Sequence, residues 1–417
     1  MRFSAVPVPV VLALGLGLSL AVASAGPAAP ADEDCLTCHG DPDLKRSDGT
    51  SLYVDQDKAK GSSHVAAGLS CVDCHADLRG TKDFPHAEKL RPVACAACHE
   101  DVYQETKASV HDGQPGRQFR VGCPDCHGTH DIRSADDLES SVSPLNLPAT
   151  CEKCHVERVK TPRGGEFIRA YESSVHFRGL KESGLTLSAN CGHCHGIHDI
   201  RPTEDPASRV ARPNIIHTCG RCHVGIEKSY REGVHGKAYI RGSGDVPVCT
   251  DCHSEHDIQS PADLRSRVYA TKVAAVCARC HDDERLGRLY GFLTSRLKTY
   301  FGSYHGTASK FGETRVANCA SCHGFHDIRV SSDPKSSINP ANLPRTCGTC
   351  HAGAGANFAK GKIHEAPAEM SGNRGAQVVK VFYVVLIAVL ISAFLLFIAA
   401  DLFRKVRVRW LSKRRRP

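Results

Sequence analysis

The stretch CGHCHGIHDIR, at residues 191–201, places two cysteines and three histidines within eleven positions. Its first five residues are one copy of the motif Cys-x-x-Cys-His, in which a histidine directly follows the second cysteine. The chain of 417 residues contains eleven such copies, and together they use all 22 of its cysteines. The paired cysteines are Cys35 and Cys38, Cys71 and Cys74, Cys95 and Cys98, Cys123 and Cys126, Cys151 and Cys154, Cys191 and Cys194, Cys219 and Cys222, Cys249 and Cys252, Cys277 and Cys280, Cys319 and Cys322, and Cys347 and Cys350. No thiol is left outside the motif, so one kind of chemistry must account for every cysteine.

The motif is the attachment signature of c-type haem, in which two thiols bond to the porphyrin and the adjacent histidine ligates the iron. A disulfide framework would not need a histidine after every second cysteine. A zinc array would need its ligands in sets of four, as two Cys-x-x-Cys pairs or one such pair with a distant histidine pair. The sequence therefore predicts eleven covalently bound haems c.

The histidine count indicates how the irons are ligated. Of the 24 histidines, eleven are the proximal ligands inside the motifs: His39, His75, His99, His127, His155, His195, His223, His253, His281, His323 and His351. The only methionines are Met1 and Met370, so methionine can serve one iron at most. Distal ligands must therefore come almost entirely from the thirteen histidines that remain, which predicts bis-histidine haems.

An internal repeat sorts these remaining histidines. The segments CPDCHGTHDIR, CGHCHGIHDIR, CTDCHSEHDIQ and CASCHGFHDIR each begin a repeat, and a second motif starts 28 residues after each of them. Every repeat thus holds two haem motifs, one histidine in an HDI element, and one in a later segment (SSVH, EGVH, GSYH or KIH). The HDI candidates are His130, His198, His256 and His326; the later ones are His176, His235, His305 and His364; and the N-terminal segment adds His64, His86 and His111. Eleven distal candidates therefore match eleven haems.

Two histidines have no place in this scheme. His193 lies between the cysteines of its motif, and His217 occupies a position that holds alanine or arginine in other repeats, so both are expected to be solvated surface residues. His130 follows His127 by three residues and lies on the proximal side of the haem that this motif tethers. It is therefore expected to ligate a neighbouring haem, as are the other HDI histidines.

The two ends of the chain predict export and anchoring. Residues 1–25 are expected to be a signal peptide, with an uncleaved anchor as the alternative. Residues 377–403 are expected to form a transmembrane helix, because the twenty residues from Val381 to Ala400 carry no charge. The tail, residues 404–417, carries eight basic residues, which predicts that it stays in the cytoplasm and that the haem domain lies in the periplasm, anchored to the inner membrane. The tail also accounts for the whole net charge of +8, which leaves no basic excess for nucleic-acid binding.

The chain between these ends is expected to comprise a three-haem segment (26–122) and four two-haem repeats (123–376). The 355 residues of 26–380 amount to about 32 per haem, which is too little polypeptide for a conventional core. The predicted fold is therefore that of a multihaem cytochrome c with haems as its core, mostly short α-helices and loops, little sheet, and one C-terminal transmembrane helix. One longer helix is expected from Asp282 to Tyr304, where apolar residues recur at helical spacing.

These motifs resemble the doubled-CxxCH multihaem cytochromes c of anaerobically respiring bacteria. The resemblance covers residues 33–365 and rests on CHG-x-HDI, on SVH, and on the N-terminal CLTCHGDPDL…LYVD…FPH; GSSH and GSYH depart slightly from SVH. It implies low-potential bis-histidine haems, packed in alternating stacked and angled pairs. It also implies electron exchange between membrane and periplasmic partners.

The expected function is a membrane-anchored electron conduit rather than an enzyme. Its expected partners are a quinol-linked membrane subunit and a periplasmic or outer-membrane cytochrome. The alternative is an oxidoreductase that acts on a small nitrogen or sulfur substrate at one open iron, although no motif departs from Cys-x-x-Cys-His. Direct quinol oxidation at the anchor would need a pocket that a single helix can hardly form alone.

Overall fold

The computed structural model describes residues 30–112, 121–156, 165–360, 364 and 374–414. The expected signal peptide and Met370 lie outside the described residues. Within these ranges the regular structure is helical, apart from one isolated bridge between Lys45 and Ser51. The expectation of short helices, loops and little sheet agrees with this architecture.

The chain forms two units, which comprise residues 1–107 with 111–146, and residues 108–110 with 147–417. The boundary at Asn146 lies inside the first two-motif repeat. The helices of the first unit are α1 (Asp32–His39), α2 (Gln56–Lys60), α3 (Ser63–Ala66), α4 (Cys71–Cys74), η1 (Ala76–Leu78), η2 (Cys95–Ala97), α5 (Glu100–Thr106) and α6 (Cys123–His127), where η marks a 3-10 helix. Those of the second are α7 (Leu147–His155), α8 (Glu166–Glu172), α9 (Val175–Lys181), α10 (Cys191–His195), η3 (Arg212–Asn214), α11 (Ile215–Gly220), α12 (Val224–Glu232), α13 (Val234–Ile240), α14 (Cys249–His253), α15 (Val273–His281), α16 (Glu284–Tyr290), α17 (Arg296–Phe301), α18 (Tyr304–Lys310), α19 (Cys319–His323), α20 (Leu343–Gly348), η4 (Phe358–Lys360) and α21 (Arg374–Arg414).

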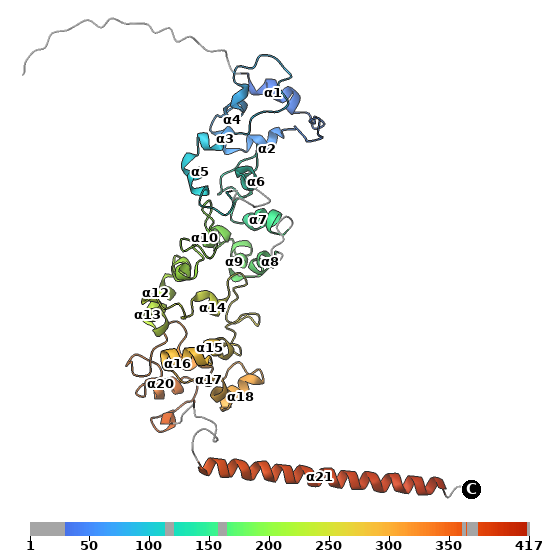
Figure 1. The fold of residues 1–417 in the computed structure, drawn as a ribbon, viewed down its shortest axis with the longest axis vertical. Helices are drawn as coiled ribbons and strands as arrows, with labels where there is room; N and C mark the ends of the chain where they lie inside the picture. The colour runs from blue at the N-terminus through green and yellow to red at the C-terminus, as the bar shows by residue number, and fades with distance from the viewer. Residues whose placement is uncertain (1–29, 113–120, 157–164, 361–363, 365–373, 415–417) are drawn as a thin grey trace, which may run out of the picture. The chain divides into compact units, whose positions relative to one another are not determined.

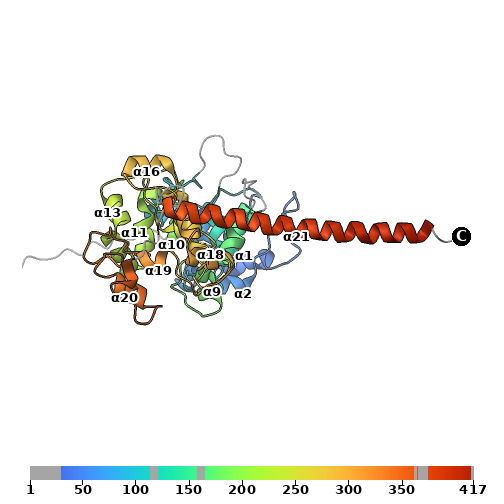
Figure 2. The ribbon, with the colours of Figure 1, turned by 90° about the horizontal axis from the view of Figure 1, so that it is seen from below.

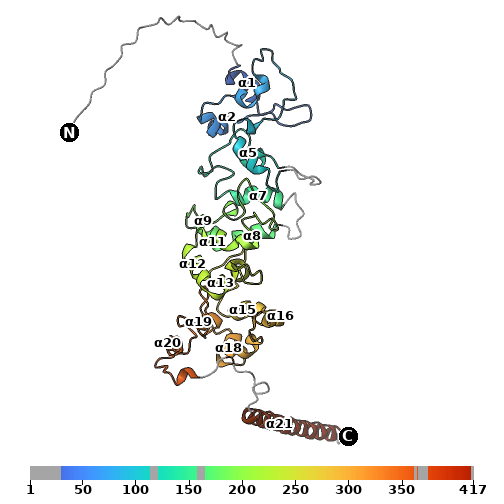
Figure 3. The same ribbon diagram turned by 60° about the vertical axis from the view of Figure 1, so that its left-hand side comes forward.

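Within the second unit, the elements of successive repeats follow one another in chain order. Figures 1 and 3 show this progression from α7 at one end, past α12 to α14, to α18 and α20 at the other. Neighbouring helices pack locally, as α12 does on α13 and α17 on α18. Consecutive repeats are in contact, as α11 with α14 and α15 with α19, and backbone hydrogen bonds also reach the repeat after next, as from Val175 to Ile258.

Apolar side chains supply little of the interior. The largest buried apolar cluster in the described residues joins Ile215, Ile216 and Val248. Several of the most deeply buried side chains are serines, among them Ser174 and Ser208. A core of this size cannot hold a chain of this length by burial of its own apolar surface, as expected for a fold that is organised around bound groups.

The prediction of a single helix from Asp282 to Tyr304 is wrong. The segment instead forms α16, α17 and the start of α18, with breaks at Gly291 and Ser295, both in the left-handed region with φ of 70°. Asp283 caps α16 by accepting a hydrogen bond from the Leu286 amide (3.0 Å). Leu286 and Tyr300 are buried, whereas Leu289 and Leu293 are 60% and 72% exposed, so the apolar spacing does not correspond to one buried face.

The C-terminal helix α21 is 41 residues long and appears in Figure 2 as one long helix. From Gln377 to Trp410 it is long and apolar enough to cross a membrane, judged by length and composition alone. It continues through most of the basic tail, so residues 404–414 are helical.

Candidate haem-binding sites

Four motifs share one local structure, a five-residue helix that begins at the first cysteine and ends at the proximal histidine. These helices are α6, α10, α14 and α19. The residue after each histidine has a positive φ (80° at Gly128, 94° at Gly196, 72° at Ser254 and 76° at Gly324). The turn there reverses the chain, which fixes the direction in which the HDI element leaves the motif.

The residue before the second cysteine caps this helix. In α14 the carboxylate of Asp251 accepts a hydrogen bond from the Val248 amide (2.7 Å), and Asp125 accepts one from the Gly122 amide (2.7 Å) in α6. His193 has the same role in α10, where its Nδ1 lies 3.3 Å from the Asn190 amide nitrogen and 2.8 Å from the Asn190 side-chain oxygen. His193 is thus a partly buried capping residue and not a simple surface histidine, whereas His217 is exposed.

Nine of the motif histidines each face one histidine from outside the motifs. The pairs are His39 with His86, His64 with His99, His75 with His130, His176 with His223, His195 with His256, His235 with His281, His253 with His326, His305 with His351, and His323 with His364. His193 and His217 belong to none of these pairs. For His111, His127, His155 and His198, the ligand roles remain predictions from the sequence repeat.

The geometry of the nine pairs indicates that a common centre sets their spacing. Ring centroids lie 6.0–6.4 Å apart in all nine, while the angle between ring planes varies from 4° to 63°. Direct ring packing would favour particular angles over a wider range of distances. A histidine nitrogen lies about 2.0 Å from a metal that it ligates, and its ring centroid about 1.1 Å beyond that nitrogen. Two imidazoles on opposite sides of one metal therefore have centroids about 6.2 Å apart. The residues present fit bis-histidine haem.

Burial prepares these rings to act as ligands. It lowers the pKa of His235 to about 4, and the neighbouring His281 lowers it further. The ring is therefore neutral near pH 7, so a nitrogen lone pair is available for a metal. Three of the paired rings have a hydrogen-bond partner at Nδ1, namely the Leu52 carbonyl for His39 (2.7 Å), the Ala87 carbonyl for His86 (2.9 Å) and the Thr299 hydroxyl for His364 (3.1 Å). Such partners orient the ring and leave Nε2 free.

The pairs connect different repeats. His256 belongs to the third repeat but faces His195 of the second, and His235 of the second faces His281 of the third. The HDI element thus reaches back along the chain, while the later histidine reaches forward. In the last repeat, His364 faces His323 of the same repeat. Neighbouring repeats therefore complete each other's histidine pairs.

A recurring backbone hydrogen bond fixes this exchange. The amide of the residue before a distal candidate (His64, His111, His176 or His235) donates to the carbonyl of the isoleucine in an HDI element. The four examples are Ser63 to Ile132 (2.8 Å), Val110 to Ile200 (2.8 Å), Val175 to Ile258 (2.9 Å) and Val234 to Ile328 (2.7 Å). We call this bond the HDI clip. It holds the forward-reaching and backward-reaching histidines at a fixed separation.

The motif cysteines meet in an alternating pattern within each unit. First cysteines lie close enough to shift each other's thiol pKa in the pairs Cys35–Cys71, Cys95–Cys123, Cys151–Cys191, Cys219–Cys249 and Cys277–Cys319. Second cysteines interact electrostatically with cysteines of the next motif: Cys74 with Cys98, Cys194 with Cys219 and Cys222, Cys252 with Cys277 and Cys280, and Cys322 with Cys347 and Cys350. Burial raises the pKa of the Cys252 thiol to about 11, so it is uncharged near pH 7. Motifs that are consecutive in sequence are therefore neighbours in space.

The loop between the two motifs of each repeat is held by polar contacts that the sequence analysis missed. In the second repeat, the Ser208 hydroxyl donates to the Arg201 carbonyl (3.3 Å), and the Asn214 amide donates to the carbonyls of Pro206 (2.8 Å) and Ser208 (2.7 Å). Arg201 also pairs with Asp205 (3.0 Å). The equivalent contacts recur at residues 133–146 and 329–342. The asparagine in the lead-in NLP or NII was the available signal for this loop.

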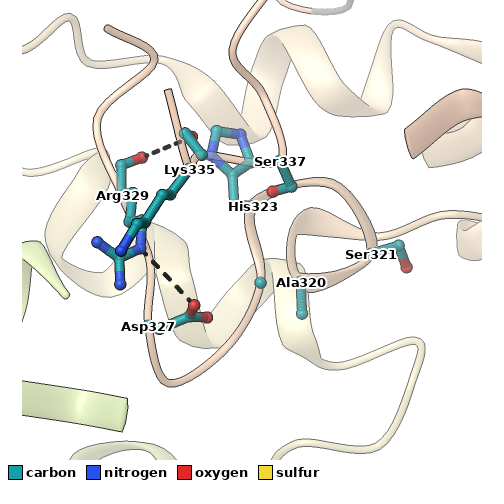
Figure 4. A pocket seen from close by; sticks show the side chains of 9 residues that line it. Ala320, Ser321, His323, Asp327, Arg329, Lys335 and Ser337 are labelled. Atoms are coloured by element: carbon teal, nitrogen blue, oxygen red, sulfur yellow. Dashed lines mark hydrogen bonds and ion pairs between the residues drawn. The ribbon is translucent and has the colours of Figure 1, made fainter. Parts of the chain in front are cut away.

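A cavity of about 180 Å³ lies beside His323 in the last repeat (Figure 4). Arg329 and Lys335 line it together with Asp327. The Arg329 side chain is 12% exposed, and its guanidinium forms ion pairs with Glu232 (2.9 Å), Asp333 (3.2 Å) and Asp327 (3.8 Å). Arg329 therefore joins its own loop to α12 of an earlier repeat, and the cavity belongs to the surroundings of this motif.

The comparisons agree with this geometry. Residues 63–156 match the family model of cytochrome c3, and residues 242–286 match the model of the doubled CXXCH motif. The chain is similar to the multiheme cytochrome MtrA of Shewanella baltica (strain OS185), with 26% identity over 124 residues, which are 30% of this chain and 32% of that protein. The match thus spans about a third of that relative's length. No solved structure matches the chain.

The Cys-x-x-Cys-His motifs and the helical fold are those of c-type cytochromes. More narrowly, the two family models and the relative show that the chain is similar to the multihaem cytochromes c. Proteins of this class bind haem covalently and carry electrons.

Proposed function

We propose that this chain transfers electrons along eleven bis-histidine haems between a quinol-linked partner in the membrane and a redox partner in the periplasm or outer membrane. In this proposal the protein serves anaerobic respiration and is anchored in the inner membrane by α21, with its haem domain in the periplasm. The observation that supports it best is the constant spacing of the nine histidine pairs, at 6.0–6.4 Å.

The residues of the chain divide the work of holding each group. The two cysteines of a motif would attach it covalently, and the motif histidine and its paired histidine would both ligate the iron. When bound, haem supplies a one-electron couple between ferrous and ferric iron. Nδ1 partners such as Leu52 and Thr299 orient their imidazoles, and they are positioning groups for His39 and His364.

The order of the motifs in space supports a conduit. Contacts between first cysteines and between second cysteines alternate from motif to motif within each unit, so each attachment site adjoins the next one in sequence. The HDI clips hold the paired histidines of adjacent sites together. A chain built in this way brings its redox groups close without a separate scaffold.

The helix α21 supports the membrane part of the proposal, because a single apolar helix followed by basic residues favours a cytoplasmic tail. Tethering raises the effective concentration of the haem domain near membrane partners. The last repeat, with His351, is nearest to the anchor in sequence and is proposed to face the quinol-linked partner. The N-terminal motifs are proposed to face the soluble or outer-membrane partner.

Haem stoichiometry and iron spin state test this function. We expect denaturing mass spectrometry of the full chain to give eleven haems, and ferric electron paramagnetic resonance to give low-spin iron throughout. Nine haems or fewer would contradict the count. A full equivalent of high-spin iron that binds carbon monoxide in the native protein would instead support an oxidoreductase with one open site.

A further inference from the structure

Two aromatic side chains in the third repeat are almost fully exposed. Tyr304, the first residue of α18, is 81% exposed, and Phe311, directly after this helix, is 88% exposed. In the second repeat the equivalent positions hold Val234 and Arg241, and in the first they hold Val175 and Glu182. The third repeat therefore has aromatic residues where the first two have valine and a charged residue.

The repeat structure explains why this edge is open. In α9 and α13, the first residue donates the HDI clip to the repeat after next, and Val175 and Val234 are partly buried. For α18 of the third repeat, that acceptor would be an HDI element beyond the one at 326–328, and the printed sequence has none there. Among the described residues, no carbonyl accepts the Tyr304 amide. The edge of α18 is thus the position that an HDI element would cover in the other repeats, and we call Tyr304, Lys310 and Phe311 the terminal edge.

The link to the membrane helix starts next to this edge. His364 is hydrogen-bonded to Thr299 of α17 (3.1 Å), and α17 packs on α18, where the Thr307 hydroxyl donates to the Phe301 carbonyl (3.2 Å). Nine residues, 365–373, separate His364 from the start of α21. An extended chain of that length spans at most about 35 Å. The terminal edge therefore cannot lie far from the membrane that α21 enters.

The chemistry of the edge suits a lipid surface. Tyrosine and phenylalanine with neighbouring lysines are typical of segments that lie in the headgroup region. Lys310 is exposed, with its Nζ 4.4 Å from the centroid of the Phe301 ring, and Lys298 of α17 is exposed as well. Each cation close to an anionic surface contributes attraction, while the rings enter the headgroup layer. Docking of a further repeat on this edge would instead require a backbone carbonyl that accepts a hydrogen bond from the Tyr304 amide.

We propose that the terminal edge binds the headgroup region of an anionic membrane, as a second contact besides the anchor. The proposal rests on the proposed function, because it assumes that α21 is inserted. A single tether lets the haem domain rotate, whereas a second contact through α18 fixes its orientation. His305, which directly follows Tyr304, faces His351 at 6.0 Å, so the contact would hold the last motif beside the membrane surface.

Photoreactive lipids test this contact in the full-length, haem-loaded chain. The protein is placed in nanodiscs of phosphatidylcholine, with or without phosphatidylglycerol, and the labelled peptides are identified by mass spectrometry. We expect label on α21 in both discs and on residues 304–311 in the anionic discs, several-fold more than in the neutral ones. Residues 234–241, which carry the exposed Ile240, are the matched control and should stay unlabelled.

The double variant Tyr304→Ser, Phe311→Ser should lose the label at residues 304–311 while α21 keeps it. An unchanged low-spin spectrum shows that the variant is folded and loaded. Label on α21 alone in the wild type would overturn this proposal and leave the proposed function intact. Label on neither would overturn the anchor itself. Crosslinks from residues 304–311 to a second copy in lipid-free detergent would overturn the proposal in favour of self-association.

Discussion

The ring of His326 lies 6.1 Å from that of His253, although His326 follows the motif histidine His323 by only three residues. The turn at Gly324, with φ of 76°, directs the HDI element away from its own motif and towards the preceding repeat. The HDI clip from Val234 to Ile328 holds it there. His323 and His326, which are close in sequence, thus belong to different candidate haem sites, whereas His253 and His326, which are 73 positions apart, share one.

His326→Ala should therefore open the haem tethered by Cys249 and Cys252, not the one tethered by Cys319 and Cys322. Electron paramagnetic resonance should show one new high-spin iron per chain. Replacing Cys249 and Cys252 by serine in the same background should remove that signal, because the opened haem is then absent.

Two variants control this experiment. Serine at Cys319 and Cys322 in the His326→Ala background should leave the high-spin signal in place. His217→Ala, at an exposed position outside the pairs, should remain fully low-spin. If the serine pair at Cys319 and Cys322 abolished the signal instead, each HDI histidine would serve its own motif.

The HDI clip predicts a position-specific effect of proline. Val234 is the first residue of α13, where proline is sterically tolerated, so Val234→Pro removes only the amide that donates to Ile328. Loss of this hydrogen bond should lower the free energy of unfolding by about 1 kcal/mol, with a further 1–3 kcal/mol if the carbonyl stays buried and unpaired. Both His235 and His326 should become less firmly held.

Tyr304→Pro provides the comparison, since it changes the same helix position in the third repeat, where no carbonyl of the described residues accepts the amide. It should be neutral, or stabilise by about 0.5 kcal/mol through the unfolded chain. Thermal unfolding followed by haem absorbance measures both variants. Equal destabilisation by the two would show that the clip contributes nothing.

Much of the haem-binding architecture follows from the sequence, because it depends on local spacing. The eleven motifs, the eleven distal candidates, and the inference that His130 cannot reach its own haem need only the positions of cysteines and histidines. The partner of each histidine does not follow, since the pairing of His130 with His75 depends on a turn and on a backbone bond from Ser63. A hydrogen bond between backbone groups does not require a particular side chain, so the sequence does not reveal it.

Two other features were obscured for different reasons. The spacing of leucines over 282–304 is as compatible with three short helices as with one amphipathic helix. Serine at position 295 does not predict the left-handed backbone conformation found there. His193 looked like a misplaced surface residue because its neighbours in the repeat are Asp and Ser. All of them accept a hydrogen bond at the helix start, which is a role that a neutral imidazole can share.

The inter-motif loop should tolerate only side chains that donate at the asparagine position. Asn214→Ala loses two hydrogen bonds, to Pro206 and Ser208, which should cost about 1–3 kcal/mol of unfolding free energy. Asn214→Lys should retain part of this unfolding free energy, because Lys272 occupies the equivalent position in the third repeat. Its Nζ lies 2.5 Å from the Leu264 carbonyl and donates to it. Denaturant unfolding of both variants measures the difference. If the lysine variant were the less stable of the two, hydrogen bonding at this position would not explain the loop.

The same loops predict where acid begins to destabilise the fold. The pKa of Asp137 and the pKa of Asp205 both lie below the usual value near 3.8. The larger cause is a hydrogen bond from the backbone amide two residues later, and the smaller cause is the loop arginine. The Lys335 amide and, to a smaller extent, Arg329 lower the pKa of Asp333 in the same way. A depressed carboxyl pKa contributes stability that is present above the unfolded pKa and is lost as pH falls through the folded one. The midpoint of thermal unfolding should therefore change little in this respect between pH 7 and 5, and fall below about pH 4. Asp333→Asn should weaken that fall, and an unaltered pH profile would assign it to other groups.

The anchor gives the last prediction. Removal of residues 374–417 deletes all of α21 and leaves every motif and every candidate ligand in place. The truncated chain should be released as a soluble protein with its full haem content, and chemical reductants should still reduce it completely. Its reduction by membranes supplied with quinol should be slower than that of the full chain, because the tether no longer raises its concentration near membrane partners. The matched control exchanges α21 for an unrelated apolar helix of the same length. If the control is reduced at the full rate, α21 acts only as a tether; if the truncated chain itself keeps the full rate at equal concentration, electrons arrive from a soluble donor.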